Sequence, residues 1–323
     1  MKAFITGATG FIGSHLADAL LSEEDNEVRC LVRSNEKWLK GKTYTKISGD
    51  LHDIPALMKG MEGADVVFHL AALVMAPNQE TLNRTNVEAT ENLIRTARRC
   101  GVKKLVILSS LAAAGPSFNR PLTEDDPLMP ISMYGESKKK MEEMIHSIAQ
   151  KDDIITILRP PAVYGPREDQ IYSFFKICAR GVCPIVGNGV SNPISMIYVD
   201  DVIQGLLLGA NQSKKGVHTY FLSSEDIYTW NEIREAVSGA LGKSLFPIYI
   251  KPGLVKGLGT MMESLGSLFG QYPVMNKDKS KEMTHEWTCS VEKIKKELSF
   301  KQNVPLKEGI SKTIAWYKKH NWI

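Results

Sequence analysis

Short apolar runs alternate with longer amphipathic segments through the first half of the chain. The apolar runs occupy residues 2–6, 27–32, 44–48, 64–70, 103–109 and 153–159. Segments with helical periodicity lie between most of them, notably at 11–21, 78–100 and 132–150. Continuously apolar strands are typical of sheets covered on both faces, and their alternation with helices indicates parallel pairing. The pattern predicts an α/β fold with a doubly wound parallel sheet.

The regular alternation ends after residue 165, next to the proline- and glycine-rich loop "RPPAVYGPRE". Residues 197–210 resemble a further strand end and helix that return to the sheet, with "YVDD" as the helix cap. We therefore predict two domains, the second smaller and rich in helices. The first spans 1–165 with 191–210 returning to it, and the second is built from 166–190 and 211–323.

Three helices are predicted in the second domain. Thr229 and Glu232 form a capping-box pattern that opens a helix to about residue 241. Two further helical patterns lie at 290–298 and 305–320.

Composition narrows the class of protein. Of the 323 residues, 43% are hydrophobic and 24% charged, as in globular proteins with a substantial core. Forty basic residues against 36 acidic ones give a net charge of +4, which is too balanced to indicate a nucleic-acid partner. The five cysteines form no C-x-x-C pair, so neither disulfides nor a metal site are expected. Without a signal-peptide pattern or an apolar run of about 18 residues, we expect a cytoplasmic protein with no integral membrane segment.

Three glycines follow the first predicted strand, at the start of the first helix. Gly7, Gly10 and Gly13 stand in "FITGATGFIGSHLADALL". A glycine turn there lets the backbone approach a pyrophosphate, and the helix N-terminus offers free N–H groups and a positive dipole end. The strand–turn–helix context therefore predicts a dinucleotide site.

The glycine spacing and six later motifs resemble those of the extended short-chain dehydrogenases/reductases. The motifs are "GDLHD", "HLAA", "NVEATENL", "LSSLAAAG", "YGESK" and "LRPPAVYGP". The resemblance covers about the first 170 residues densely and is nearest to the dihydroflavonol-reductase and 3β-hydroxysteroid-dehydrogenase branches. It implies a Rossmann-type fold, an NAD(P)-dependent enzyme and a small-molecule substrate.

The resemblance also implies the cofactor contacts. Asp50 and Leu51 would lie near the adenine, Ala71 and Ala72 beside the cofactor, and Pro160, Ala162 and Val163 near the nicotinamide. His69 is interpreted as a packing residue beneath the cofactor. The full implied set is Gly7, Thr9, Gly10, Phe11, Ile12, Gly13, Arg33, Ser34, Asp50, Leu51, Ala71, Ala72, Tyr134, Lys138, Pro160, Ala162 and Val163.

The end of the second predicted strand bears on the choice of cofactor. Arg33 and Ser34 stand where an acidic residue would hold the ribose of NAD(H). A guanidinium matches a 2′-phosphate in charge and geometry, which favours NADP(H) and leaves NAD(H) possible. Arg33 as a solvated loop residue is the alternative.

Tyr134 precedes Lys138 by four residues, so both side chains lie on one face of a helix. A tyrosine with a pKa near 10 exchanges protons at neutral pH only where nearby positive charge lowers that pKa. The resemblance makes Tyr134 the acid/base and Lys138 its partner. It assigns the third catalytic hydroxyl to Ser110, with Ser109 as the alternative. Lys139 and Lys140 are expected to be surface charges.

Three functions fit these motifs. The first is an oxidoreductase acting on a ketone/alcohol pair, the second a nucleotide-sugar epimerase or dehydratase with tightly bound NAD, and the third a non-enzymatic NADP(H) sensor. Arg33 and the apolar "SSLAAAG" favour the first. Arg167 is either a substrate anchor or a surface ion pair.

An apolar stripe at 253–273 bears on the substrate. It contains Leu254, Leu258, Met261, Met262, Leu265, Leu268 and Phe269. It predicts a helix over an apolar substrate, with core packing and membrane-surface binding as alternatives.

A homodimer is expected through the helices at 78–100 and 132–150. The contacts would come from Leu93, Ile94, Met141, Met144 and Ile145.

Overall fold

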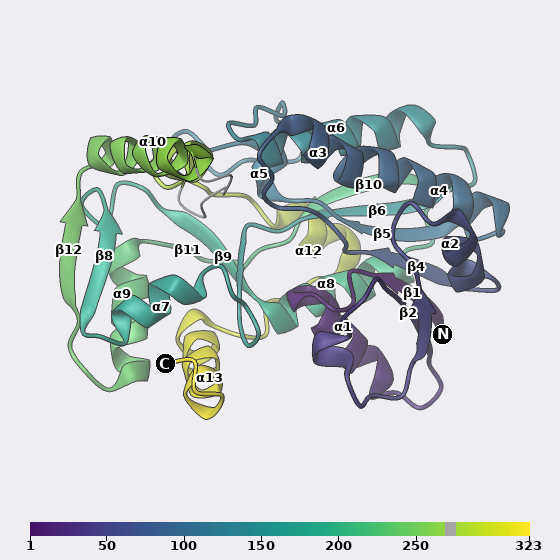
Figure 1. Ribbon diagram of the computed structural model, residues 1–323, viewed down its shortest axis with the longest axis horizontal. Helices are drawn as coiled ribbons and strands as arrows, with labels where there is room; N and C mark the ends of the chain where they lie inside the picture. Colours follow the sequence, from purple (N-terminus) through teal and green to yellow (C-terminus); the bar gives the residue numbers. More distant parts are fainter. Residues whose placement is uncertain (269–275) are drawn as a thin grey trace.

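Seven parallel strands form the central sheet of the protein, in the order β10-β6-β5-β4-β1-β2-β3 (Figure 1). The computed structural model describes the backbone of residues 1–268 and 276–323, with side chains in these ranges except at 258–259 and 263–268. The strands are β1 (Lys2–Thr6), β2 (Glu27–Val32), β3 (Thr45–Ser48), β4 (Val66–His69), β5 (Lys104–Leu108), β6 (Ile154–Arg159) and β10 (Gly216–Phe221). The predicted Rossmann-type parallel sheet is confirmed.

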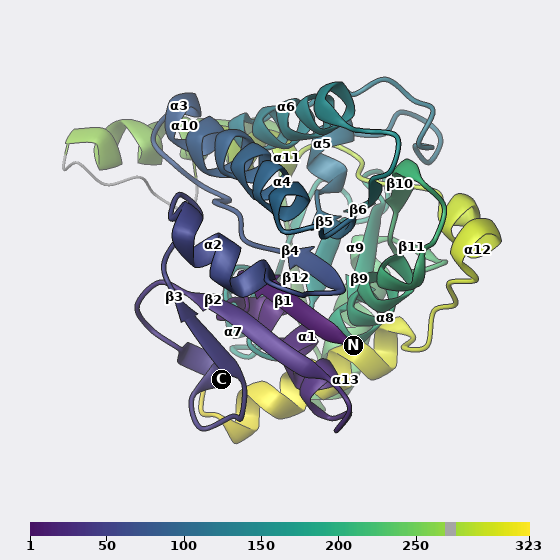
Figure 2. The ribbon, with the colours of Figure 1, turned by 90° about the vertical axis from the view of Figure 1, so that its right-hand side faces the viewer.

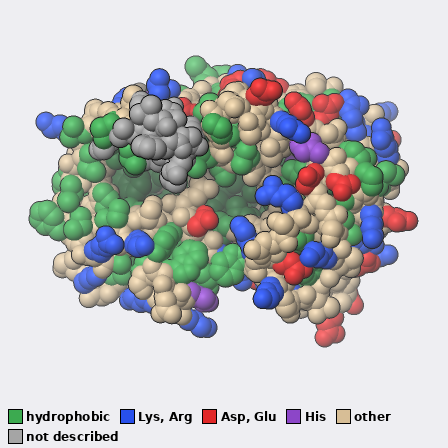
Figure 3. Space-filling model, in the orientation of Figure 1, with side chains coloured by type: hydrophobic (Ala, Val, Ile, Leu, Met, Phe, Trp, Pro, Cys, Tyr) green, Lys and Arg blue, Asp and Glu red, His purple; other side chains and the backbone are tan. Residues whose placement is uncertain are grey.

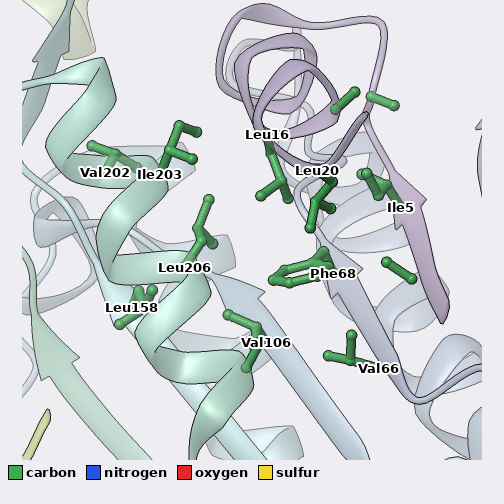
Figure 4. Close-up of a cluster of buried hydrophobic side chains, with 14 of the residues drawn as sticks. Ile5, Leu16, Leu20, Val66, Phe68, Val106, Leu158, Val202, Ile203 and Leu206 are labelled. Atoms are coloured by element: carbon green, nitrogen blue, oxygen red, sulfur yellow. The ribbon is translucent and has the colours of Figure 1, made fainter. Parts of the chain in front are cut away.

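Helices cover both faces of this sheet (Figure 2). One face carries α1 (Phe11–Leu21) and α8 (Val199–Asn211), and the other carries α2 (Ile54–Met61), α4 (Ala89–Arg99) and α6 (Met133–Ile148). On the first face, Leu16 and Leu20 of α1 and Leu206 of α8 converge on strand residues such as Phe68 (Figure 4). Each fully buried side chain of this kind stabilises the fold by about 1.5–3 kcal/mol.

The predicted helix at 78–100 has three parts, which are α3 (Gln79–Asn83), the π-helical turn η2 (Arg84–Glu88) and α4. A π-helical turn widens a helix locally and often marks a functional site. Here it surrounds Asn86, whose side chain is hydrogen-bonded to the loop after β4, as described below.

A smaller, helix-rich part contains two short sheets, β11-β9-β7 and β12-β8 (Figure 1). Its strands are β7 (Ala162–Tyr164), β8 (Val182–Val186), β9 (Ile194–Tyr198), β11 (Ile227–Tyr228) and β12 (Phe246–Ile250). Its helices are α7 (Tyr172–Cys178), α9 (Trp230–Leu241), α10 (Pro252–Leu268), α11 (Lys277–Glu282) and α13 (Leu306–Lys319). The remaining elements are η1 (Lys37–Leu39), α5 (Leu111–Ala114) and α12 (Glu292–Leu298).

Strand β10 joins the central sheet by pairing with β6, although the sequence placed residues 211–323 in the second domain. The returning segment contributes α8 to the central sheet's face, while β9 pairs outside that sheet. The exact division into two domains stays a prediction.

Two expectations about helix starts have different outcomes. The capping box is present, since Thr229 and Glu232 exchange side-chain and backbone hydrogen bonds at the start of α9. The segment "YVDD" does start α8, with Tyr198 as the N-cap residue, but none of its side chains makes a cap hydrogen bond. The Asp201 carboxylate instead accepts hydrogen bonds from the N–H groups of Asn303 and Val304, at 2.9 and 3.1 Å.

The side chains expected at a dimer interface mostly lie inside the chain. Leu93, Ile94, Met141 and Ile145 are fully buried against the central sheet, so they cannot contact a second copy. Met144 is half-buried. The homodimer itself stays a prediction, which light scattering can test.

The apolar stripe at 253–273 coincides with α10 as far as Leu268, and Phe269 lies outside the described residues. Leu254, Met261 and Met262 are exposed, so these three side chains do not close a core. The side chains of Leu258, Leu265 and Leu268 are not described. Among the described residues, no helix has both the length and the apolar character needed to cross a membrane.

Candidate functional site

The glycine loop between β1 and α1 packs tightly against the end of β4. Gly7 has a φ of +79°, and a Cβ there would come within 2.5 Å of the Ala71 nitrogen. A Cβ on Gly13 would overlap the backbone of Gly7. Gly10 is the N-cap residue of α1 and supplies no side-chain cap. These glycines form a side-chain-free cradle at a helix N-terminus, which fits a pyrophosphate.

His69 is buried beneath this loop and is bonded through both ring nitrogens. Its Nδ1 lies 2.7 Å from Thr6 Oγ1, and its Nε2 lies 2.8 Å from Thr90 Oγ1. Because the Thr90 hydroxyl donates to the Asn86 carbonyl, it accepts from Nε2–H of His69. Burial lowers the pKa of His69 to about 3. The interpretation of His69 as a packing residue beneath the cofactor stays a prediction.

Asn86 ties the loop after β4 to the helix that carries Tyr134. Its side chain accepts a hydrogen bond from Leu73 N–H and donates one to the Leu73 carbonyl, both at 2.8 Å. It also donates to Ser137 Oγ at 2.9 Å. The loop that holds Ala71 and Ala72 is thereby positioned relative to α6.

Ser110 and Tyr134 are neighbours in space, because α5 and α6 approach closely. A Cβ on Gly135 would overlap the Ala112 carbonyl, so the glycine permits this approach. Ser110 is the N-cap of α5, and its Oγ accepts from Ala112 N–H at 3.1 Å. Burial raises the pKa of Tyr134 well above its ordinary value, with the Ser110 hydrogen bond opposing and the Glu282 charge adding to that rise.

Lys138 is 2% exposed and donates a hydrogen bond to the Leu108 carbonyl at 2.8 Å. Burial lowers its pKa to about 8, and the Glu142 charge opposes that change. The sequence predicted that Lys138 lowers the pKa of Tyr134. In this structure burial dominates and that pKa is raised. Lys139 and Lys140 pair with Glu143 and Glu136 at 4.0 and 3.7 Å, as surface charges.

A buried ion pair beneath Lys138 was not anticipated from the sequence. Glu142 and Arg159 are 1% and 5% exposed, and Arg159 Nη2 lies 2.5 Å from Glu142 Oε2. Ser109 Oγ donates to Glu142 Oε1 at 2.5 Å, which turns this hydroxyl away from the role considered for it. Glu142 follows Lys138 by four residues in the same helix. That spacing is the sequence signal that could have placed the Glu142 carboxylate near Lys138.

The remaining expected cofactor contacts lie at the carboxyl edge of the sheet. Thr9, Phe11 and Ile12 belong to the glycine loop and the first turn of α1, and Asp50 and Leu51 follow β3. Pro160 follows β6, and Ala162 and Val163 lie on β7. Arg33 and Ser34 are exposed at the end of β2.

Arg167 forms an ion pair with Asp18 at 2.7 Å and donates to Ser14 Oγ at 3.0 Å. Of its two interpretations, this geometry supports the ion pair.

Helix α11 connects the smaller part of the molecule to α6, the helix that carries Tyr134. The Asp278 carboxylate accepts a hydrogen bond from Met133 N–H at 2.8 Å, next to Tyr134. Figure 3 shows a hollow between the two parts of the molecule, with hydrophobic side chains on its walls. The sequence did not anticipate the Asp278 contact.

The model of the NAD dependent epimerase/dehydratase family matches residues 3–224. The chain belongs to this family. It is therefore an NAD(P)-dependent enzyme of the extended short-chain dehydrogenase/reductase class, as the motifs indicated. The family binds a nicotinamide cofactor, and the glycine cradle fits one.

Relatives in this family include both redox enzymes and epimerases. Ceramide reductase of Caulobacter vibrioides is 29% identical over 328 residues, which cover 99% of this chain and 95% of that protein. The 3beta-hydroxysteroid-dehydrogenase/decarboxylase isoform 1 of Arabidopsis thaliana is 27% identical, covering 96% and 78%. The N-acetyl-alpha-D-glucosaminyl-diphospho-ditrans,octacis-undecaprenol 4-epimerase of Escherichia coli O157:H7 is 27% identical, covering 76% and 73%.

Proposed function

We propose that the protein is an NADP(H)-dependent oxidoreductase that interconverts a ketone and a secondary alcohol on a mainly apolar substrate. The observation that carries this proposal is the close packing of α5, which Ser110 caps, against the first turn of α6, which carries Tyr134 and, one helical turn further on, Lys138. A bound nicotinamide cofactor would supply or accept the hydride. The side chains of the protein would then have to supply or accept the proton.

Tyr134 is the proposed acid/base. In the reducing direction its phenol donates a proton to the substrate oxygen, while Ser110 holds that oxygen by a hydrogen bond. The raised pKa of Tyr134 keeps the phenol protonated, which is the form that reduction requires. Lys138 is the proposed ligand of the nicotinamide ribose, and its pKa of about 8 keeps it mostly charged at neutral pH.

The preference for NADP(H) rests on Arg33. Its guanidinium is exposed at the carboxyl end of β2 and forms no hydrogen bond or ion pair within the described part of the chain. A 2′-phosphate would offer it a charge-assisted partner. NAD(H) remains the alternative cofactor.

Two observations support an apolar substrate. The residues after Ser110 are apolar, and Leu111 and Ala114 are buried in the core, so this segment presents no charged group to a substrate. The relatives named above act, by name, on a ceramide, a 3β-hydroxysteroid and an undecaprenol-linked sugar. Each of these molecules has a large hydrocarbon part.

The test combines a substrate panel with one substitution. Purified protein is incubated with NADPH and hydrophobic ketones, and NADPH absorbance and product chromatography are followed. We expect turnover of an apolar ketone, and a loss on the order of 10²-fold or more in Tyr134→Phe, because general acid catalysis contributes that much. Wild-type activity in folded Tyr134→Phe would overturn the mechanism.

The epimerase relative supports a second candidate, a sugar epimerase with tightly bound NAD. The two candidates differ in what the purified protein carries. Bound NAD released on denaturation, together with turnover of UDP- or dTDP-sugars and none of apolar ketones, would replace the oxidoreductase proposal.

A further inference from the structure

Six large hydrophobic side chains are exposed on β12 and the adjoining helix α10. They are Phe246 at 71%, Ile248 at 45%, Tyr249 at 50%, Leu254 at 62%, Met261 at 53% and Met262 at 39% exposure. We call this set the β12–α10 surface. All six lie within seventeen consecutive residues, 246–262. Single exposed hydrophobic residues are ordinary in proteins, but a cluster of this size marks an interaction surface.

The position of β12 and α10 in the fold leaves the β12–α10 surface exposed. Strand β12 pairs with β8 on one side, in a sheet of two strands, and so lies at a sheet edge (Figure 1). Helix α10 starts two residues after β12 ends, and Val255, at 4% exposure, anchors its first turns. With Val255 facing inward, the exposed Leu254 lies on another side of the helix.

The charge around the surface indicates its partner. Residues 243–262 contain Lys243, Lys251 and Lys256 and no Asp or Glu. In Figure 3, the charged side chains visible on the side that carries β12 and β8 are Lys and Arg. A surface that combines exposed apolar side chains with lysines matches the headgroup region of an anionic bilayer. A second copy fits less well, because a two-fold interface would bring the same lysines together.

We propose that the β12–α10 surface docks the protein peripherally on an anionic lipid bilayer. Lys251 and Lys256 face the lipid phosphates, and exposed apolar side chains of the surface enter the headgroup–acyl boundary. Binding of this kind needs no membrane-crossing helix. The proposal goes beyond the proposed reaction and is independent of it, because vesicle binding is measured without turnover.

The test is flotation of the full-length protein with vesicles. One set is pure phosphatidylcholine, and the other contains a third of phosphatidylglycerol. We expect binding to the anionic vesicles that weakens with added salt, because exposed charges are screened. Phe246→Ser/Ile248→Ser and, separately, Lys251→Glu/Lys256→Glu should weaken it on the order of tenfold or more.

Matched variants separate this surface from general hydrophobicity and charge. Phe118→Ser/Met129→Ser alters two side chains that are 68% and 65% exposed elsewhere, and Lys318→Glu/Lys319→Glu changes charge at the end of α13. Both controls should bind like the wild type. Equal loss in the controls, or no binding of the wild type to anionic vesicles, would overturn the proposal. A concentration-dependent dimer abolished by Phe246→Ser/Ile248→Ser would show that a second copy covers the surface instead.

Discussion

The ammonium group of Lys138 donates a hydrogen bond to the carbonyl oxygen of Leu108, at 2.8 Å. This contact joins α6 to the carboxyl end of β5, two residues before Ser110. The side chain is nearly inaccessible, and burial lowers its pKa to about 8. The charge is therefore held in place before any ligand binds.

Replacing Lys138 by methionine should impair both turnover and cofactor binding. The variant keeps the length of the side chain but loses a charge-assisted contact, so NADPH should bind roughly 10- to 100-fold more weakly. Fluorescence titration of NADPH and steady-state kinetics measure the two effects. Lys140→Met is the control, because Lys140 pairs with Glu136 at the surface and should leave both values unchanged. Unchanged NADPH binding in Lys138→Met would show that Lys138 does not contact the cofactor.

Arg33→Asp should weaken NADPH binding by about 1.5–3 kcal/mol, the range of a charge-assisted hydrogen bond. The affinity for NADH should change less, since that cofactor has no 2′-phosphate. Titration of both cofactors against wild type and variant measures the change in preference. Arg99→Ala, an exposed arginine at the end of α4, is the control. If the wild type prefers NADH, Arg33 has been misinterpreted.

Glu142→Gln should destabilise the protein by about 3–5 kcal/mol, because Arg159 would remain buried without its partner charge. Urea unfolding at neutral pH measures the loss. Glu143→Gln is a matched control in the same helix, since Glu143 is exposed and its pair with Lys139 spans 4.0 Å. Equal stability of the two variants would contradict the importance of the buried pair.

Glu142→Gln should also alter the pH dependence of cofactor binding. The Glu142 charge raises the pKa of Lys138, so its removal lowers that pKa further below 8. NADPH affinity should then decline at a lower pH than in the wild type. A purely structural role of Glu142 would reduce stability without this shift.

His69 should make the protein sensitive to mild acid. Its pKa is about 3 in the folded chain and 6.5 unfolded, so between these values the unfolded state binds the extra proton. The contribution of neutral His69 to the stability of the fold is therefore fully present above pH 6.5 and is lost as the pH falls toward 3. From pH 7 to pH 5 this single group should lower the free energy of unfolding by about 2 kcal/mol.

Urea unfolding at the two pH values compares wild type with His69→Gln, in which the acid-induced loss should be smaller. His146→Gln, at an exposed position on α6, should retain the full loss. If His69→Gln does not fold, proton NMR of the wild type provides the check. A His69 ring signal that titrates near pH 6.5 would contradict the prediction.

Local patterns in the sequence were sufficient for the parts of the protein that depend on neighbouring residues. The six apolar runs became strands β1 to β6 because continuous apolar character reflects burial on both faces. The capping box at Thr229 formed because its hydrogen bonds span only three residues. The four-residue spacing placed Tyr134 and Lys138 on one helix face, and Gly7, Gly10 and Gly13 came together in one turn.

The tertiary structure decided which surfaces meet. Periodicity shows that a helix face is apolar but not what covers it, so Leu93 and Met141 belong to the core and not to a dimer interface. The Ser109 hydroxyl turns to Glu142, thirty-three residues away, and Ser110 is left beside Tyr134. Asp201, in the first turn of α8, accepts hydrogen bonds from the backbone of Asn303 and Val304, about a hundred residues further along the chain. Each of these contacts joins residues far apart in sequence, where only the folded chain determines which polar group lies within hydrogen-bonding distance.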